Sequence, residues 1–519
     1  APSLAPLLAD THPARDVARN LFRLARLARQ QADDPLPRTE VDMAEQWWKT
    51  ADGHMDNGHR DRSRVLRSLA TQAISQTEPL DVSEFPAATI DALIASETLR
   101  DLGNDKVSFR HDVLREWAIA FLINADKSVF QQLPVQHPAT SAHARAVEIL
   151  SRAVLERASD SSDWQSLLES LSTNNIHGSW RRAVILSLVR SEIAKTLLTR
   201  ARGLLLADEG KLLSEVIRLV MAVDVLPAAQ VLAKTGMDIS MIPNTLNMPS
   251  GPSWWKLILW LKNSEDNLPA EAIPDVVDLY TNWSAGVLGH DPFTPSLLQS
   301  LYKWLTEIED SREAQNLRNM SSPFGDALEY EQILALESKL RRGFLLFCNH
   351  APDLAVQYLK ALKGRRHTRD AVRSILRLSS RLAQAAPAEL AEMAATALIT
   401  DDDSDKDGYR TEFRGPFEYI DHEFSPPSPT QGPFLDLLTH APEIGKTLIH
   451  KLVEYAIGFY SGGRDHGNDA ISIAFPKGEH IFPWVRSYSW SREGAGHNCV
   501  TSGLMALEGW AHRRIEAGE

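Results

Sequence analysis

Three aspartates in an acidic run are the residues whose types and spacing best suit metal chemistry. Asp403, Asp405 and Asp407 alternate along the chain and precede Gly408, which is the order of ligands and turn glycine in the first half of a calcium loop. The twelfth position of such a loop should hold a bidentate glutamate, but here it holds Arg414. We therefore interpret the run as a solvated acidic loop, with calcium bound by the three aspartates as the alternative.

The same acidic run, which starts at Asp401, also resembles the magnesium-binding runs of prenyl-diphosphate enzymes. In those enzymes the run lies within a helix that faces a cavity, whereas here it follows the end of a predicted helix. An all-α metal-dependent enzyme that uses the carboxylates near Asp401 is therefore one alternative for the function.

His111 is the second candidate, because it lies at a predicted junction between a strand and a helix. Val107–Phe109 alternates as a short strand does, and apolar residues recur at spacings of three and four after Asp112, as in an amphipathic helix. The start of a helix offers free N–H groups and the positive end of the helix dipole, which can hold a phosphate. His111 could contact such a phosphate or simply cap the helix, and the sequence leaves both interpretations open.

An alternating aromatic stretch near the C-terminus could bind a ligand. It consists of Trp484, Arg486, Tyr488 and Trp490. Aromatic rings with an arginine between them can stack a base or another flat ligand, but the same alternation is typical of one buried face of a β-hairpin. We predict a hairpin with strands at 471–475 and 484–490 around Lys477-Gly478.

The stretch from His440 to Thr447 ends like the phosphate-binding loop of an NTPase. That loop needs a glycine at its first position and a turn of free N–H groups ahead of the helix. Here the first position is His440, and Pro442 predicts the start of a helix that already contains Gly445. We therefore predict no ATP-hydrolysing site and no catalytic residues in this chain.

The overall composition bounds the partners of the chain. The 519 residues carry a formal net charge of −13, which makes nucleic-acid binding by bulk charge unlikely but does not exclude a local basic face. Only two cysteines, Cys348 and Cys499, are present, which fits a reducing compartment. No apolar run is long enough to cross a bilayer, so we expect a cytoplasmic protein without membrane contact.

The elements that position these residues are predicted to be mostly helical. An N-terminal group of helices ends in a small hairpin, with strands at 98–102 and 107–109 around Gly103-Asn104-Asp105. From about 140 to 400, helical patterns follow one another through short polar loops, which predicts an irregular helical-repeat solenoid. The fold class is therefore all-α predominantly, with a winged-helix-like N-terminal unit, a HEAT- or TPR-like array and a small C-terminal β-hairpin.

Changes in composition divide the chain into five predicted parts. They are a helical lid remnant (1–35), a winged-helix-like domain (36–128), a helical-repeat array (129–400), an acidic and proline-rich excursion (401–433) and a C-terminal helical domain with the hairpin (434–519). The lid is predicted to be one helix at 14–32 with a row of arginines on one side. This row forms either a solvated face or a contact with nucleotide or another domain.

The residues F-R-H-D-V-L-R-E-W-A-I-A at Phe109–Ala120 resemble the end of the winged-helix domain of NACHT-type STAND NTPases. The predicted elements before it, a basic lid helix and a tryptophan-rich helix at 39–50, are in the order found in that family. In the family the winged-helix histidine contacts the β-phosphate of bound ADP and helps to lock the resting state. The resemblance therefore implies that His111 is a nucleotide-contact residue.

The C-terminal half is similar to the long helical regions of large bacterial STAND proteins, in the stretches 425–438 and 504–510. Because we find no Walker A or Walker B motif, the resemblance implies the region that follows the NTPase core and not the core itself. It implies no cofactor in this fragment, ADP or ATP with magnesium in the full-length protein, and an N-terminal NTPase core upstream of the sequence.

The resemblance also implies a function in signalling. A non-catalytic regulatory region of this family would bind a protein ligand through its helical array and form homo-oligomers on activation, in some relatives during antiviral defence. The alternatives are a helical-repeat scaffold without nucleotide control and the metal-dependent enzyme named above.

Overall fold

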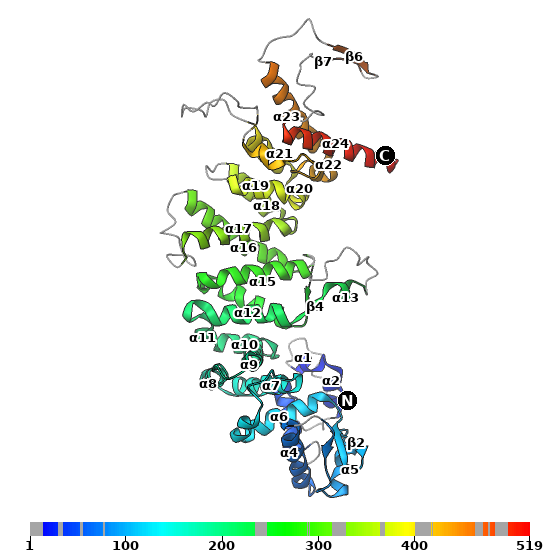
Figure 1. The fold of residues 1–519 in the computed structure, drawn as a ribbon, viewed down its shortest axis with the longest axis vertical. Helices are drawn as coiled ribbons and strands as arrows, with labels where there is room; N and C mark the ends of the chain where they lie inside the picture. The colour runs from blue at the N-terminus through cyan, green and yellow to red at the C-terminus, as the bar shows by residue number, and fades with distance from the viewer. Residues whose placement is uncertain are drawn as a thin grey trace. The chain divides into compact units, whose positions relative to one another are not determined.

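The chain folds predominantly into helices with a few short strands, as predicted. The computed structural model describes all residues except 1–13, 30–34, 52–55, 76–77, 234–246, 288, 290, 314–327, 364–368, 400–416, 418, 462–470, 476–477, 483–496 and 519. The chain divides into two compact units, Ala1–Val276 and Val277–Glu519, each of which is described by itself (Figure 1).

The predicted lid helix at 14–32 is two helices in the structure, α1 (Ala14–Ala18) and α2 (Leu21–Arg29). The break lies at Asn20, whose side-chain oxygen accepts hydrogen bonds from two backbone N–H groups in the first turn of α2, at 3.0 and 3.3 Å. An asparagine in this position satisfies the free amides at a helix start. The prediction of one continuous helix was wrong, because Asn20 caps a second helix.

A small antiparallel sheet follows in the N-terminal unit. The elements of this part are α3 (Glu40–Thr50), α4 (His59–Ser75), β1 (Leu80–Asp81), α5 (Ala87–Ala95), β2 (Leu99–Gly103), β3 (Lys106–Phe109) and α6 (Asp112–Ala125). Strands β2 and β3 form the predicted hairpin, and Asn104 and Asp105 between them both have positive φ angles, as tight hairpin turns require. The strand order is β1-β3-β2. We did not predict β1, because two residues are too few to show alternation.

Helices continue to the end of the N-terminal unit, with one more small pair of strands. The elements are η2 (Lys127–Gln132), α7 (Ser141–Arg157), α8 (Ser162–Ser170), α9 (Gly178–Arg190), α10 (Ala194–Arg200), α11 (Arg202–Leu206), η3 (Asp208–Gly210), α12 (Lys211–Val223), β4 (Val225–Pro227), α13 (Ala228–Leu232), β5 (Asn247–Pro249), α14 (Ser253–Ser264), η5 (Glu265–Asn267) and η6 (Ala270–Ala272). Helix α6 packs against α7, and α7 packs against α9. The fully buried indoles of Trp117, Trp164 and Trp180 come from α6, α8 and α9.

The C-terminal unit is also built from helices that pack on their neighbours in sequence, such as α16 on α17 and α22 on α23. Its elements are α15 (Ile273–Gly286), which starts before the boundary, α16 (Thr294–Glu313), α17 (Tyr330–Phe347), η8 (Cys348–His350), α18 (Pro352–Lys363), α19 (Arg369–Arg377), α20 (Ser379–Ala385), α21 (Pro387–Leu398), η10 (Tyr419–Phe424), α22 (Phe434–His440), α23 (Pro442–Ser461), β6 (Ile471–Phe475), β7 (Gly478–Phe482) and α24 (Asn498–Glu516). Among the described helices, none is both long and apolar enough to cross a membrane.

The C-terminal hairpin is present, but its second strand was predicted at the wrong place. β6 coincides with the predicted strand at 471–475, and its partner β7 is Gly478–Phe482 in place of 484–490. The register pairs Phe475 with Gly478. The aromatic alternation at 484–490 misled the prediction, because the chain already turns back two residues after β6 ends.

Candidate functional site

His111 lies at the N-cap position of α6, as the predicted strand-to-helix junction requires. Its backbone is extended (φ −139°, ψ 143°), but its side chain makes no capping hydrogen bond. The residue is exposed to solvent. His111 is therefore the N-cap residue by its backbone conformation, as one of the two interpretations predicts, but its side chain does not cap the helix.

The His111 ring is in contact with helix α2. The ring of Phe22 lies 4.8 Å from it, centroid to centroid, in an edge-to-face arrangement. Phe22 also lies 5.9 Å from the buried Trp117 of α6, and Trp117 lies 5.9 Å from Trp47 of α3. These ring contacts connect α2 to both α3 and α6.

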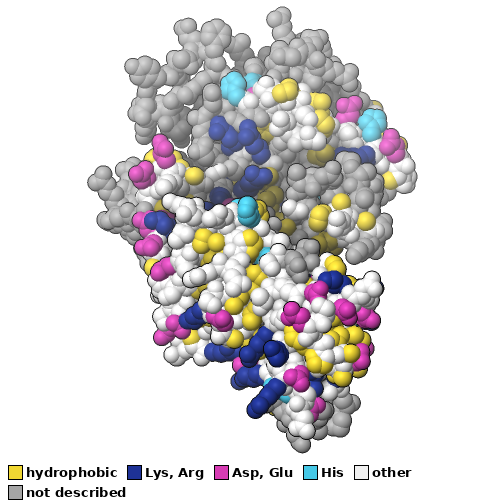
Figure 2. Space-filling view, turned by 60° about the horizontal axis from the view of Figure 1, so that its bottom comes forward, with side chains coloured by type: hydrophobic (Ala, Val, Ile, Leu, Met, Phe, Trp, Pro, Cys, Tyr) yellow, Lys and Arg dark blue, Asp and Glu magenta, His cyan; other side chains and the backbone are white. Residues whose placement is uncertain are grey.

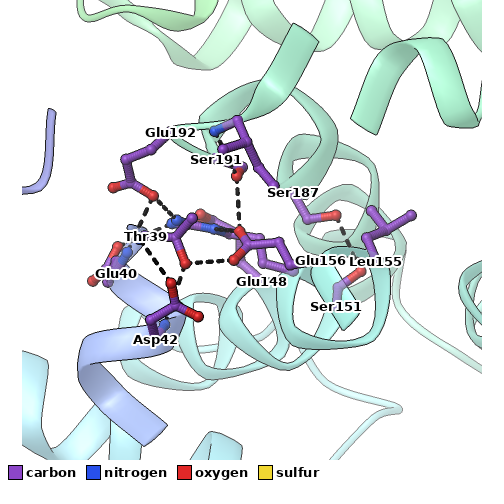
Figure 3. Close-up of polar contacts among 12 residues, drawn as sticks. Thr39, Glu40, Asp42, Glu148, Ser151, Leu155, Glu156, Ser187, Ser191 and Glu192 are labelled. Carbon is purple, nitrogen blue, oxygen red and sulfur yellow. Dashed lines mark hydrogen bonds and ion pairs between the residues drawn. The ribbon is translucent and has the colours of Figure 1, made fainter. Parts of the chain in front are cut away.

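A group of buried and half-buried charged residues adjoins these rings, and we call it the charged junction. Figure 3 labels its four glutamates. It joins α2 and α3 to α7, to α9 and to Ser191 and Glu192, the two residues that follow α9. Its members are Arg23, Glu40, Arg145, Glu148, Arg152, Glu156, Arg190 and Glu192.

Glu40 lies at the centre of the charged junction, with 1% of its side chain exposed. Its Oε2 atom is 2.6 Å from Arg23 Nη2 and 2.9 Å from Arg152 Nη1. Arg145 pairs with the same oxygen, and the Trp117 indole donates a hydrogen bond to Oε1 at 3.2 Å. One carboxylate thus binds three guanidinium groups, one from α2 and two from α7.

The local sequence fixes the position of Glu40, which is the first residue of α3. The Thr39 hydroxyl accepts a hydrogen bond from the Asp42 N–H group, and the Asp42 carboxylate accepts one from the Thr39 N–H group, both at 3.2 Å. This reciprocal capping box holds the start of a helix in one conformation. The Glu40 N–H group also donates to Glu192 Oε2 at 3.2 Å, so both the backbone and the side chain of Glu40 are held by the charged junction.

Arg152 of α7 is the buried cation of the charged junction, with 1% of its side chain exposed. Its guanidinium lies 2.9 Å from Glu40 and 3.4 Å from Glu156, and it also bonds Glu192. All three of its nitrogen atoms therefore have a carboxylate partner, as a buried cation requires. Glu156 in turn accepts hydrogen bonds from two hydroxyl groups, those of Thr39 and of the serine after α9, at 2.6 and 2.7 Å.

Glu40 and Arg152 of the charged junction both stay charged at neutral pH. Burial alone would raise the pKa of Glu40, but the three guanidinium groups around it outweigh burial and lower the pKa to about 2. Burial alone would lower the pKa of Arg152, but its carboxylate partners raise it. Removing one partner of a buried ion pair costs about 3–5 kcal/mol, because the other charge stays buried. The charged junction therefore favours a single arrangement of α2, α3 and α7.

Glu116 of α6 borders the charged junction and titrates differently. Burial raises the pKa of Glu116. Arg145, whose Nε atom is 3.9 Å from Glu116 Oε2, lowers this pKa, but neighbouring carboxylates raise it again. The resulting pKa is about 7. Glu116 therefore changes charge near neutral pH, whereas Glu40 stays ionised.

A cavity of about 690 Å³ lies beside the charged junction, with walls from α1, α2, the end of α12, β4 and the start of α14. Charges of both signs line it, including Asp16, Asp224 and Lys256. The cations of the charged junction are already paired with protein carboxylates, and Lys256 Nζ donates to the Ser191 carbonyl at 2.7 Å. We therefore assign no anionic ligand to this cavity.

Helix α2 is held mainly by polar and ring contacts. Of its described side chains, Leu27 is the one that is buried and apolar, and Leu21 is 82% exposed. Arg23 and Phe22 supply the contacts with the charged junction and with the rings of α6. A helix held in this way can be released by a change in charge more readily than one packed in an apolar core.

The other three predicted sites, which are the acidic run, the aromatic stretch and the segment like a phosphate-binding loop, are not part of the charged junction. Asp403, Asp405 and Asp407 lie outside the described residues, as do Trp484, Arg486, Tyr488 and Trp490, so calcium and the aromatic ligand surface stay predictions. Within the described part of the chain, no three His, Cys, Asp or Glu side chains are grouped to hold a metal. The segment that resembles a phosphate-binding loop starts at the last residue of α22, His440, and α23 begins at Pro442, as predicted, so that Gly445 lies within the helix. Lys446 there pairs with Glu443 at 2.6 Å.

Sequence reasoning found His111 but missed the charged junction. Arg23 was one of several arginines in a predicted stripe, and nothing set it apart from the rest. Glu40 follows Thr39 at a helix start, where an acidic residue is ordinary because it favours the helix dipole. The one available signal was the density of arginine and glutamate in 145–156, a stretch that also carries the apolar spacing of a buried helix.

Comparison with known proteins adds no family. No model of a protein family matches the chain, and no curated protein matches it.

Proposed function

We propose that this chain is the non-catalytic regulatory and ligand-sensing region of a STAND-type signalling ATPase. In this proposal α1 and α2 are the helical lid, the elements from α3 to α6 are the winged-helix domain, and the later helices form the array that binds a protein ligand. In this proposal release of the lid leads to homo-oligomer formation, with antiviral defence as the setting, and the ATPase itself belongs to an NTPase core that precedes this region.

The observation that carries this proposal is the charged junction. Arg23 of the proposed lid and the buried Arg152 of α7 both pair with Glu40, the first residue of the proposed winged helix, and both also pair with Glu192. Buried ion pairs contribute little net stability but make one arrangement much better than its neighbours. A ligand that displaces α7 or the residues after α9 would therefore release α2 and α3 together, and such coupling between two sites is what a switch requires.

The surroundings of His111 support a second part of the proposal. The imidazole is exposed, stands at the start of α6 and touches the lid through Phe22. An ADP phosphate held by an upstream NTPase core would meet a ring nitrogen and the positive end of a helix dipole there. Loss of the lid contact would then change how firmly His111 holds the nucleotide.

The test uses the full-length protein and measures the ADP that stays bound through purification, by acid release and chromatography. Glu40→Gln removes the central carboxylate of the charged junction. We expect this variant to lose most of its ADP and to hydrolyse ATP without ligand. Glu97→Gln is the matched control, because Glu97 also pairs with an arginine of α2, Arg29 at 2.8 Å, but on the surface.

Three results would contradict the proposal. The first is a gene that encodes no NTPase core upstream. The second is equal ADP retention in both variants. The third concerns Arg23→Gln, which cuts the lid from the charged junction but leaves Arg152 paired. If Arg23→Gln and His111→Ala both fold and retain ADP as the wild type does, the chain is a helical scaffold without nucleotide control.

A further inference from the structure

The outer face of α4 carries a row of arginines in the N-terminal unit. Residues of this helix with apolar side chains, such as Val65, Leu66 and Leu69, are buried in the core. Arg60, Arg64 and Arg67 are exposed. We call these three residues the α4 arginine row. Figure 2, which brings this end of the molecule forward, shows Lys and Arg side chains gathered on its surface.

The α4 arginine row differs from the other arginine of the same helix in its partners. Arg62 is buried and its guanidinium is 3.0 Å from the Asp56 carboxylate. No side chain of the α4 arginine row forms a hydrogen bond or ion pair with any described residue. The arginines of the charged junction, by contrast, are all neutralised by carboxylates. The row is therefore a set of charges for which the described protein supplies no counter-charge.

The spacing places the three guanidinium groups on one surface. Positions 60, 64 and 67 are separated by four and three residues, which are the spacings of neighbours on one face of a helix. At 1.5 Å per residue the row extends about 10 Å along the axis. The three arginines outnumber Asp61, which is the only acidic residue of α4.

We propose that the α4 arginine row binds the phosphate backbone of a nucleic acid, without reading its sequence. Arginine is the side chain best suited to phosphate, because its planar donors match two phosphate oxygens. Consecutive charges along about 10 Å suit a regular polyanion better than a single ion. This inference is independent of the function proposed above.

The rest of the α4 face favours a nucleic acid over a protein partner. Stable protein interfaces have an apolar or aromatic centre surrounded by a polar rim. The outward positions of α4 beside the row are Ser68, Thr71 and Ser75, and all three are polar. A surface of cations and hydroxyl groups with no apolar centre binds through charge, so its affinity should depend strongly on salt.

The experiment measures binding of the whole chain to a fluorescent 20-base-pair DNA duplex by anisotropy, between 50 and 200 mM NaCl. Three phosphate contacts predict a slope of log K against log salt of about −2.7, or roughly 40-fold weaker binding at the higher salt. The variant R60Q/R64Q/R67Q should bind at least about tenfold more weakly at 50 mM and bring the slope close to zero. Charge reversal, R60E/R64E/R67E, should abolish binding.

The matched control is R100E/R182E/K195E, which changes the net charge as much as the reversal variant does. These three residues are exposed, lie on other elements of the N-terminal unit and have no described side-chain partner. We expect the control to keep most of the affinity. Thermal melting of each variant separates loss of the surface from loss of the fold, and the glutamine variant should melt as the wild type does.

Several outcomes would overturn the proposal. Equal losses in the row and control variants would show that only overall charge matters. No binding of the wild type to duplex or single-stranded DNA at 50 mM NaCl would remove the proposal. Binding to phosphatidylserine vesicles but not to DNA would assign the row to a membrane surface, and binding to an acidic polypeptide such as polyglutamate alone would assign it to a protein partner.

Discussion

The ring of Phe22 lies edge to face against the imidazole of His111, with the two centroids 4.8 Å apart. Phe22 lies in α2, and His111 is the N-cap residue of α6. Because α2 has one buried apolar side chain, Leu27, this contact and the ion pairs of Arg23 are the main interactions that hold it. His111 is linked to the charged junction through Phe22 and then Trp117.

The first prediction concerns this ring contact. Phe22→Ala should loosen α2, because an edge-to-face ring pair contributes about 0.5–1.5 kcal/mol beyond the area that it buries. Hydrogen–deuterium exchange of the amides at 21–29 should become about 2- to 10-fold faster. Leu21→Ala is the control, since Leu21 is 82% exposed. Equal exchange in the two variants would show that the ring contact does not hold α2.

The second prediction concerns the stability of the charged junction. Glu40→Gln leaves Arg152 buried beside a neutral group, so the N-terminal unit should lose about 3–5 kcal/mol of its free energy of unfolding. Urea denaturation at pH 7 measures this loss. Glu97→Gln removes a surface pair whose side chains are 51% and 57% exposed, and it should change stability by less than about 1 kcal/mol. If Glu40→Gln also lost less than about 1 kcal/mol of its free energy of unfolding, the charged junction would adjust to the missing charge.

Some local features were predictable from the sequence. The turn at Gly103-Asn104-Asp105 predicts β2 and β3, because its residues tolerate positive φ angles. Pro442 predicts the start of α23. Gly445 therefore lies within a helix and not in a phosphate-binding turn ahead of it. In each case the residues that determine the structure lie within a few positions of it.

The long-range features were not predictable in the same way. Glu40 and Arg152 are 112 positions apart, and no local pattern in either helix says that they meet. The strands β4 and β5 have three residues each, which is too short for an alternating pattern. Asn20 shows a different kind of error, because asparagine is a common helix cap and the break between α1 and α2 was open to prediction.

The third prediction concerns pH. The pKa of Glu116 rises from 4.5 to about 7 in the folded protein. Below pH 4.5 both the folded and the unfolded chain hold the proton, so there is no penalty. Between pH 4.5 and 7 the unfolded chain releases it and the folded chain keeps it, so folding is progressively destabilised, by about 1–3 kcal/mol in total.

Glu116→Gln removes this penalty. The variant should match the wild type near pH 4 and become more stable than it as the pH rises to 7, which urea denaturation across pH measures. Glu97→Gln is the control, because the pKa of Glu97 is lowered by Arg29 and the sign of any change should be reversed. A constant difference between Glu116→Gln and the wild type from pH 4 to 8 would show that Glu116 titrates normally.

The fourth prediction concerns the segment of α23 that resembles a phosphate-binding loop. A Cβ atom at Gly445 would lie 2.8 Å from the backbone nitrogen of Leu438 in α22, so this glycine permits close packing of two helices. Gly445→Ala should destabilise the C-terminal unit by about 1–3 kcal/mol, because the clash is with backbone and α22 would have to move.

Gly458 on the same helix serves as the control, because it is exposed and a Cβ atom there meets nothing within 4 Å. Gly458→Ala should therefore stabilise the helix by up to about 1 kcal/mol. Thermal or urea unfolding of both variants measures the contrast, and a stabilising Gly445→Ala would mean that α22 and α23 pack less closely than the structure describes.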